Sequence, residues 1–143
     1  MNETEFESLV IEGYASRFGQ VDNGGDVVRR GAFFRTLLNR QLRDVKMLWQ
    51  HDPEKPVGRW LQLYEDQRGL FVKGVLNPAL FQGREAAQMI RSGLVDGLSI
   101  GFKARKATRD RRSGLRQILS VDLWEISLVT FPLLSSARLQ VRD

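Results

Sequence analysis

The sequence predicts a mainly β fold of about seven strands with two helices, and three patterns support this prediction. Several segments of strand length alternate apolar and polar residues or are rich in β-branched residues. Turn residues separate these segments at the spacing typical of a barrel or a sandwich. Two other segments carry apolar residues at helical spacing. Because the 143 residues contain no repeat and no linker-like stretch, we expect one domain over residues 1–143.

Composition excludes several classes of protein. Hydrophobic residues make up 42% and charged residues 27% of the chain, as in soluble globular domains. No apolar run approaches the ~20 residues that cross a bilayer, and the acidic residues 1–5 do not resemble a signal peptide. The absence of cysteine excludes disulfides, thiolate metal sites and a cysteine nucleophile, and the single histidine, His51, argues against a zinc site. We therefore expect no cofactor, no metal and a reducing, cytoplasmic setting.

The net charge of +5 is concentrated in one segment. Seven lysines and arginines and one aspartate lie between residues 103 and 116, which leaves a net charge of −1 for the rest of the chain. We expect residues 105–114 to form a flexible basic loop, because they contain too few apolar residues to order themselves. Such loops bind phosphate without sequence specificity. The candidates for weak nucleic-acid contact are Arg105, Arg109, Arg111 and Arg112.

The first third of the chain predicts a strand, a loop and a helix. Residues 8–15 have the β-branched, apolar composition of a strand, and an Asn-Gly-Gly turn marks a loop at residues 19–25. We interpret Asp22 and Asp26 as turn-forming residues, because the spacing of a calcium loop is missing. Residues 32–40 predict a helix whose apolar face contains Phe33, Phe34, Leu37 and Leu38.

The middle of the chain predicts three strands and a second helix. A strand at residues 45–53 would end at Pro53 and place on one face Val45, Met47, Trp49 and His51. Strands at 57–65 and 69–76 follow, joined by a tight hairpin turn. Residues 77–93 predict a helix with Asn77 as its cap, Pro78 in its first turn and Gly93 at its end.

The last third predicts a strand at residues 97–102 and a long β-rich run at 115–129. In that run, alternation places Trp124, Ile126 and Leu128 on one face and Leu123, Glu125, Ser127 and Val129 on the other. The tail at residues 133–143 is expected to contain at most a short last element.

Ser99 lies in an unusual strand pattern. Leu98, Ile100 and Phe102 share the apolar face of residues 97–102, and Ser99 stands between two glycines on the other. Glycine inside a strand marks a place where another group approaches the backbone closely. A serine held rigidly and reachable from one side suits a nucleophile. A bulge or a crowded strand crossing, with a serine that has no chemical role, is the alternative.

His51 and Glu125 are candidates for an acid–base pair. His51 closes an apolar row before a polar loop, which suits a general base or, alternatively, a core histidine bonded to a neighbour. A half-buried Glu125 needs a partner to stay charged, and the single histidine is the simplest candidate. The alternative is that Glu125 is exposed on an edge strand. The order His51, Ser99, Glu125 differs from three known triad orders, but geometry and roles, not order, define a triad.

Five segments together resemble the prohead (procapsid maturation) proteases of tailed bacteriophages. Three surround the candidate residues, at positions 48–52, 97–102 and 124–132, and two lie earlier, at 13–18 and 25–33. The resemblance runs in order from Gly13 to Pro132. It implies a closed antiparallel β-barrel with flanking helices, similar to the herpesvirus protease assemblin, whose triad also runs histidine, serine, third member.

The same resemblance implies the roles of the candidate residues. Ser99 would be the nucleophile of a serine endopeptidase, His51 its general base, and Glu125 the residue that orients and charges His51. The substrate would be the scaffold or the scaffolding segment of the major capsid protein, and the protease itself, cleaved inside the assembling procapsid in the host bacterial cytoplasm. A homodimer is also implied, and the apolar face at residues 33–38 is large for so small a domain.

Two differences from the resembled proteins affect these expectations. Assemblins carry paired arginines after the third triad member, where backbone forms the oxyanion hole, whereas this chain reads Phe131-Pro132-Leu133-Leu134. The chain is also shorter than phage relatives with C-terminal extensions. The alternative function is a non-catalytic β-barrel module for capsid assembly or nucleic-acid binding through residues 103–116. Against it, the aromatic residues lie mostly on core-like faces and do not interleave with the basic ones.

Overall fold

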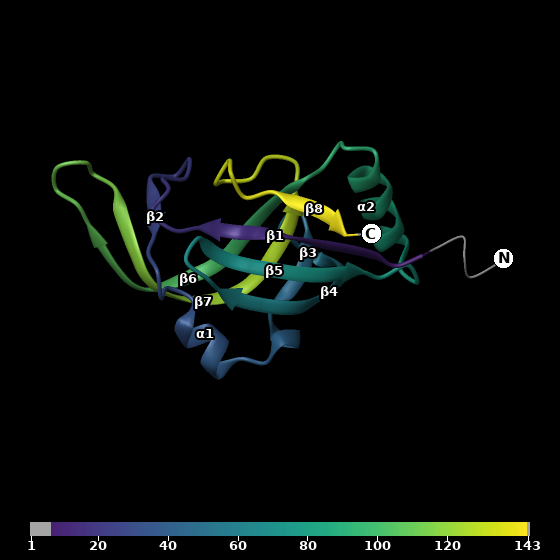
Figure 1. The fold of residues 1–143 in the computed structure, drawn as a ribbon, viewed down its shortest axis with the longest axis horizontal. Coiled ribbons are helices and arrows are strands. Elements are labelled where there is room, and N and C mark those ends of the chain that lie inside the picture. The colour runs from purple at the N-terminus through teal and green to yellow at the C-terminus, as the bar shows by residue number, and fades with distance from the viewer. Residues whose placement is uncertain (1–6, 143) are drawn as a thin grey trace.

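The computed structural model describes residues 7–142, which form a mainly β fold of eight strands (Figure 1). The strands are β1 (Leu9–Arg17), β2 (Asp26–Val28), β3 (Lys46–Trp49), β4 (Asp52–Glu65), β5 (Gly69–Leu76), β6 (Gly97–Arg109), β7 (Arg116–Val129) and β8 (Leu139–Arg142). The helical elements in these residues are α1 (Phe34–Asn39), the short 3₁₀ helix η2 (Leu42–Asp44) and α2 (Phe81–Arg91). The predicted mainly β class is confirmed, with β2 as an additional short strand.

The strands form one sheet in the order β2-β7-β3-β4-β5-β1-β8, with β6 paired to β7 outside this path. β7 is the central strand for the site, because it pairs antiparallel with β6 and parallel with both β2 and β3. An isolated bridge between Gly97 and Arg138 connects the start of β6 with the segment before β8. The backbone bonds Leu98 N–H to Ala137 O (2.9 Å) and Leu139 N–H to Asp96 O (2.8 Å) flank this bridge.

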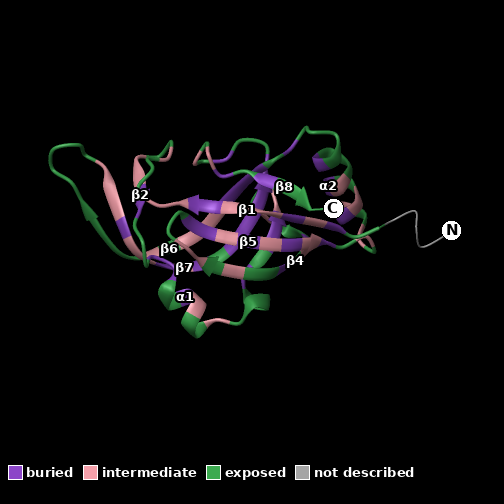
Figure 2. Ribbon diagram, in the orientation of Figure 1, coloured by how far each residue is buried: buried purple, intermediate pink, exposed green. Residues whose placement is uncertain are grey.

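The buried residues of the core lie mostly on the strands, and α2 adds Ala86 and Ile90 (Figure 2). In β5 the predicted alternation is present, since Leu70, Val72 and Leu76 are buried while intervening residues are partly exposed. α2 packs against β4, and Gly83 allows the helix to approach both this strand and the turn before the helix: a Cβ there would lie 3.1 Å from the Val57 carbonyl oxygen and 2.1 Å from that of Asn77. No helix within residues 7–142 has the length and apolar character needed to span a membrane.

Both helices are shorter than predicted. α2 begins at Phe81 because Asn77 does not cap it; the Asn77 side chain accepts the Ala79 N–H (2.9 Å) in the turn before the helix. In α1 the predicted common apolar face is wrong, because Phe33 precedes the helix and is fully buried. Phe34 and Leu38 are 66% and 69% exposed.

The prediction of one strand over residues 45–53 is wrong. β3 ends at Trp49, and β4 begins at Asp52 and continues through Pro53 and Pro56. The register between β3 and β4 shifts on both sides of Leu48. Proline is tolerated in this stretch because such irregular pairing needs fewer ladder hydrogen bonds.

The basic segment is mostly hairpin and not a loop over residues 105–114. β6 and β7 stay paired as far as Arg109 and Arg116, so only residues 110–115 form the turn. The hairpin extends away from the rest of the fold, and its tip is exposed (Figures 1 and 2). Backbone pairing orders these strands while the charged side chains remain in solvent. The predicted tail at 133–143 contains β8, which pairs with β1.

Candidate active site

His51 lies in the tight turn between β3 and β4. Trp49 pairs with Asp52, and the two residues between them, Gln50 and His51, have φ angles of 52° and 61°. Positive φ at both central positions is characteristic of a type I′ turn, a conformation that side chains other than glycine and asparagine rarely adopt. His51 therefore does not continue the apolar row of the strand; its side chain is 43% exposed.

Contacts with β7 and the residue after it hold this strained turn. The Gln50 N–H donates to the Leu128 carbonyl oxygen (2.9 Å). The Gln50 side chain donates to Thr130 Oγ1 (2.7 Å) and accepts the Thr130 N–H (3.1 Å). The His51 N–H donates to the hydroxyl oxygen of Ser127 (3.0 Å). The position of His51 thus depends on tertiary contacts as well as on its local sequence.

Glu125 is nearly buried on β7, next to a β-bulge. Gly101 pairs with Glu125 and Phe102 pairs with Leu123, so Trp124 is an extra residue in the ladder. Trp124 is 52% exposed, whereas Leu123 and Ile126 are fully buried. The predicted faces are therefore wrong at this point: Leu123 belongs to the core side, and Trp124 does not share the face of Ile126.

The Glu125 carboxylate joins two other residues. Its Oε2 lies 2.5 Å from His51 Nδ1, and its Oε1 accepts a hydrogen bond from the Ser127 hydroxyl (2.7 Å). The partnership between His51 and Glu125 that the sequence suggested is therefore present. The pKa of His51 is raised above its ordinary value because the carboxylate accepts a hydrogen bond from the ring, and the nearby negative charge adds to this while partial burial opposes it.

Ser99 lies on β6. This strand pairs with one edge of β7, and β3 pairs with the other edge of β7. The partner of Ser99 in the ladder is Ser127, and Gly101, two residues on, pairs with Glu125. Ser99 is buried. Glu125 thus lies two residue pairs along the ladder from the pair of Ser99 and Ser127, while the turn that carries His51 bonds to Ser127.

The two glycines beside Ser99 allow close approach, as their pattern predicted. A Cβ on Gly101 would lie 2.4 Å from Glu125 Oε2, and a Cβ on Gly97 would lie 2.8 Å from the Pro132 ring. Real Cβ atoms are essentially never this close to another atom. One glycine therefore accommodates the carboxylate that holds His51, and the other accommodates the chain after β7.

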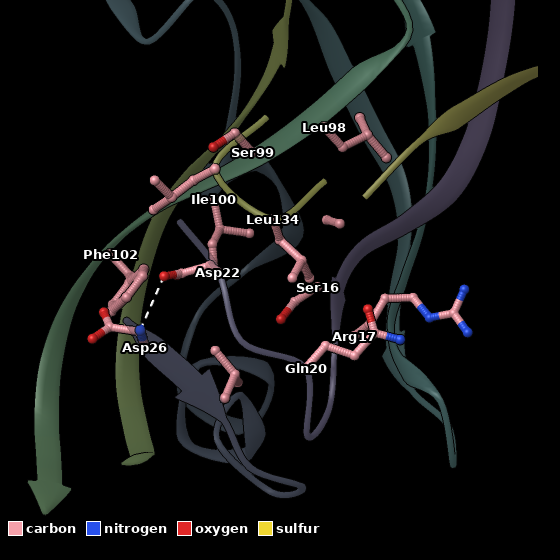
Figure 3. A pocket seen from close by; sticks show the side chains of 13 residues that line it. Ser16, Arg17, Gln20, Asp22, Asp26, Leu98, Ser99, Ile100, Phe102 and Leu134 are labelled. Atoms are coloured by element: carbon pink, nitrogen blue, oxygen red, sulfur yellow. Dashed lines mark hydrogen bonds between the residues drawn. The ribbon is translucent and has the colours of Figure 1, made fainter. Parts of the chain in front are cut away.

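A small pocket adjoins Ser99 between β6, β1 and the loop before β2 (Figure 3). Asp22 and Asp26 lie on its wall, and both carboxylates have structural partners. Asp22 accepts the N–H groups of Gly24 (2.8 Å) and Asp26 (3.0 Å), and Asp26 binds Arg116 through both oxygens (2.9 and 2.8 Å). Asp22 is therefore a turn-forming residue, as predicted.

Two other carboxylates near the candidate residues in sequence are engaged elsewhere. Asp122 pairs with Arg105 (3.3 Å) and Arg35 (3.8 Å). Asp52 accepts the Glu54 N–H (2.9 Å). The residue that the sequence interpretation missed is Ser127, which bonds to both Glu125 and the His51 backbone. Its signal was a small polar residue inside an otherwise apolar run.

The sequence model of a family described as caudovirus prohead serine protease matches residues 1–143. The prohead protease of Enterobacteria phage HK97 is 38% identical over 125 residues, which cover 86% of this chain and 55% of that protein. The capsid polyprotein of Pseudomonas phage PAJU2 is 35% identical over 133 residues, 88% of this chain and 19% of that protein. The chain thus spans about half the length of the HK97 protease and a smaller share of the PAJU2 polyprotein.

Solved structures are similar in fold. The capsid assembly protease of bacteriophage T4 has a TM-score of 0.65 at 16% identity, over 90% of this chain and 86% of that one. The KSHV protease in complex with a hexapeptide phosphonate inhibitor has a TM-score of 0.57 at 14% identity, over 96% of this chain and 66% of that one. The chain therefore has a fold similar to that of the herpesvirus proteases.

Proposed function

Because the chain belongs to the caudovirus prohead serine protease family, we propose that it is a serine endopeptidase in which His51, Ser99 and Glu125 form the catalytic triad. The observation that carries this proposal is the 2.5 Å contact between His51 Nδ1 and Glu125 Oε2, two residue pairs along the β6–β7 ladder from Ser99. A carboxylate bound at Nδ1 fixes the proton there and leaves the Nε2 lone pair available to accept the serine proton.

The reaction follows the usual course of a serine protease. The Ser99 Oγ attacks the scissile carbonyl carbon while His51 Nε2 takes the hydroxyl proton. The tetrahedral intermediate collapses as the imidazolium returns that proton to the leaving amine, which yields an acyl-enzyme. A water molecule then gives a proton to His51 and attacks the ester carbonyl carbon. As the bond to the Ser99 oxygen breaks, the imidazolium returns that proton to Ser99 and the second product leaves as an acid. Throughout, Glu125 stabilises the imidazolium, and the raised pKa of His51 reflects this stabilisation.

We infer that the substrates are capsid precursors: the scaffold or the scaffolding segment of the major capsid protein, and the protease chain itself, processed within the procapsid in the host cytoplasm. The similarity to a protein named capsid polyprotein favours this substrate class. Co-expression with the cognate capsid protein is expected to yield shortened capsid chains, and Ser99→Ala is expected to abolish the shortening. Unchanged shortening by Ser99→Ala would contradict the assignment, as would failure of a fluorophosphonate to label the wild-type chain at Ser99.

We propose that the sheet functions as a closed barrel and that the protease is a homodimer. The bridge between Gly97 and Arg138 and its two flanking backbone bonds support closure between β6 and the segment before β8. Exposure of Phe34 and Leu38, one turn apart on α1, supports an apolar dimer contact on that helix.

We propose that the tip of the β6–β7 hairpin makes weak contact with nucleic acid, through the phosphates. Arg105 is paired with Asp122, and Arg109 donates to the Gly114 carbonyl oxygen (2.6 Å), so these two arginines also stabilise the hairpin. Arg111 and Arg112 lie in the exposed turn. The alternative of a non-catalytic binding module is less favoured, because it gives no reason for a histidine bonded to a nearly buried carboxylate.

A further inference from the structure

Ser127 occupies a position between the other residues of the site. It is fully buried on β7, opposite Ser99 in the ladder and two residues after Glu125. The two serines are therefore both buried and form one residue pair of the ladder. Their surroundings differ, because the Ser127 hydroxyl has two specific partners on the side of His51.

The hydroxyl of Ser127 uses both kinds of hydrogen-bonding capacity within the site. A serine hydroxyl has one proton to donate and lone pairs to accept. The Ser127 proton goes to Glu125 Oε1 (2.7 Å), and the oxygen accepts the backbone N–H of His51 (3.0 Å). Since Oε2 of the same carboxylate contacts His51 Nδ1, the four groups close a ring from the His51 backbone through Ser127 and Glu125 to the His51 imidazole.

The ring connects two features that would otherwise be poorly fixed. Glu125 has rotatable side-chain bonds, and a second contact at Oε1 determines which oxygen faces the imidazole. His51 has a positive φ, which persists only where surrounding contacts hold it. We propose that Ser127 is a positioning residue whose single hydroxyl fixes both the Glu125 carboxylate and the His51 backbone; this inference rests on the proposed function.

The test compares Ser127→Ala and Ser127→Thr with a matched control, Ser120→Ala. Ser120 lies on the same strand outside the site, and the threonine variant keeps the hydroxyl. The first measurement is the NMR signal of the His51 Nδ1 proton, which is unambiguous because His51 is the single histidine of the chain. We expect this signal in the wild type, in Ser120→Ala and in Ser127→Thr, and its loss through rapid exchange in Ser127→Ala.

The second measurement separates kcat from KM for a capsid-derived peptide. Loss of a hydrogen bond to a charged group is expected to lower kcat by about 10- to 100-fold in Ser127→Ala while KM stays within about threefold of wild type. We expect Ser127→Thr to recover most of this loss. A folded Ser127→Ala that keeps the Nδ1 signal and the wild-type kcat would overturn the proposal. A Ser127→Ala that does not fold would also overturn it, because the hydroxyl would then be a general structural requirement.

The two measurements distinguish this proposal from the proposed function. If Ser99→Ala cleaved like the wild type, the triad assignment would fail. The NMR result would still report whether Ser127 holds His51 and Glu125 together, because it does not depend on turnover.

Discussion

Replacing Gly101 by alanine tests the geometry of the site without removing any of its functional groups. A Cβ at this position would lie 2.4 Å from Glu125 Oε2, 2.7 Å from its Cδ and 2.9 Å from its Cγ. An ordinary van der Waals contact needs about 3.4 Å or more, so the carboxylate would have to move by about 1 Å. Because backbone pairing in the ladder fixes Gly101 and Glu125 relative to each other, the side chain of Glu125 is the part that has to move.

A shift of this size is incompatible with the two contacts of the carboxylate. Oε2 lies 2.5 Å from His51 Nδ1 and Oε1 lies 2.7 Å from the Ser127 hydroxyl. Protein hydrogen bonds have donor–acceptor distances of about 2.5 to 3.2 Å, so a displacement of about 1 Å breaks at least one of the two. Misplacement of a catalytic group by this amount costs roughly 100-fold in rate. We therefore expect Gly101→Ala to fold and to lose about 100-fold in kcat/KM.

The assay is the rate at which a fluorophosphonate labels Ser99, together with cleavage of a capsid-derived peptide. The matched control is Gly24→Ala, because a Cβ on Gly24 would meet only the Asp22 carboxylate at 3.4 Å and its φ is not positive. We expect the control to behave like the wild type. A folded Gly101→Ala with the wild-type labelling rate and an intact His51 Nδ1 signal would refute the reasoning.

Five further predictions concern the triad, the titration of His51, the tip of the β6–β7 hairpin and the exposed face of α1. Glu125→Gln should fold and cleave up to about 10⁴-fold more slowly, whereas Asp122→Asn should stay within about tenfold of wild type; the reverse order in kcat/KM would invalidate the triad. Because a general base must be neutral and the pKa of His51 is raised, kcat/KM should rise with pH through a midpoint above about 6.5. The extra stability from protonated His51 should be complete below about pH 6.5 and be lost as pH rises through the folded-state pKa, and Glu125→Gln should remove this dependence, as measured by denaturant unfolding. Replacing residues 110–115 by a two-residue Asn-Gly turn should leave peptide cleavage unchanged and weaken salt-sensitive DNA binding; loss of peptide cleavage would show that the tip belongs to the site. Leu38→Asp should reduce self-association in light scattering, and a monomeric wild type with full activity would exclude the dimer.

Alternation and glycine placement made much of the fold and site predictable. Most of β1, β4, β5 and β7 and the start of β6 were predicted, because these segments of strand length alternate apolar and polar residues or are rich in β-branched residues. Glycines in the Ser99 strand indicated close approach, and the structure has Glu125 and Pro132 at those places. The pairing of Glu125 with the single histidine followed from the cost of burying an unpaired charge.

The turn that carries His51 was not predictable, because its sequence lacks the usual signals. A type I′ turn normally contains Asn-Gly or Asp-Gly, whereas this one contains Gln50 and His51. Its conformation is held by Leu128, Thr130 and Ser127, which lie more than seventy residues later. Local propensity cannot report such contacts, so the sequence favoured a continuous strand.

The bulge at Trp124 had a larger effect on the interpretation of the site. In a regular strand, Val121, Leu123 and Glu125 would share one face. Val121 and Leu123 are fully buried in the core, so a regular strand would also carry Glu125 into it. The extra residue resets the alternation: the core side of β7 continues with Ile126 and Leu128.

The bulge thus reconciles a continuous core with a charged residue on the same strand. It moves Glu125 and Ser127 to the side of β7 that faces the His51 turn, where the carboxylate gains two hydrogen bonds. Trp124, although apolar, is left outside, and the guanidinium of Arg40 lies 4.7 Å from the centre of its ring. Asp122 then lies on the same side as Glu125, and its pairing with arginines, not its face, excludes it as the partner of His51.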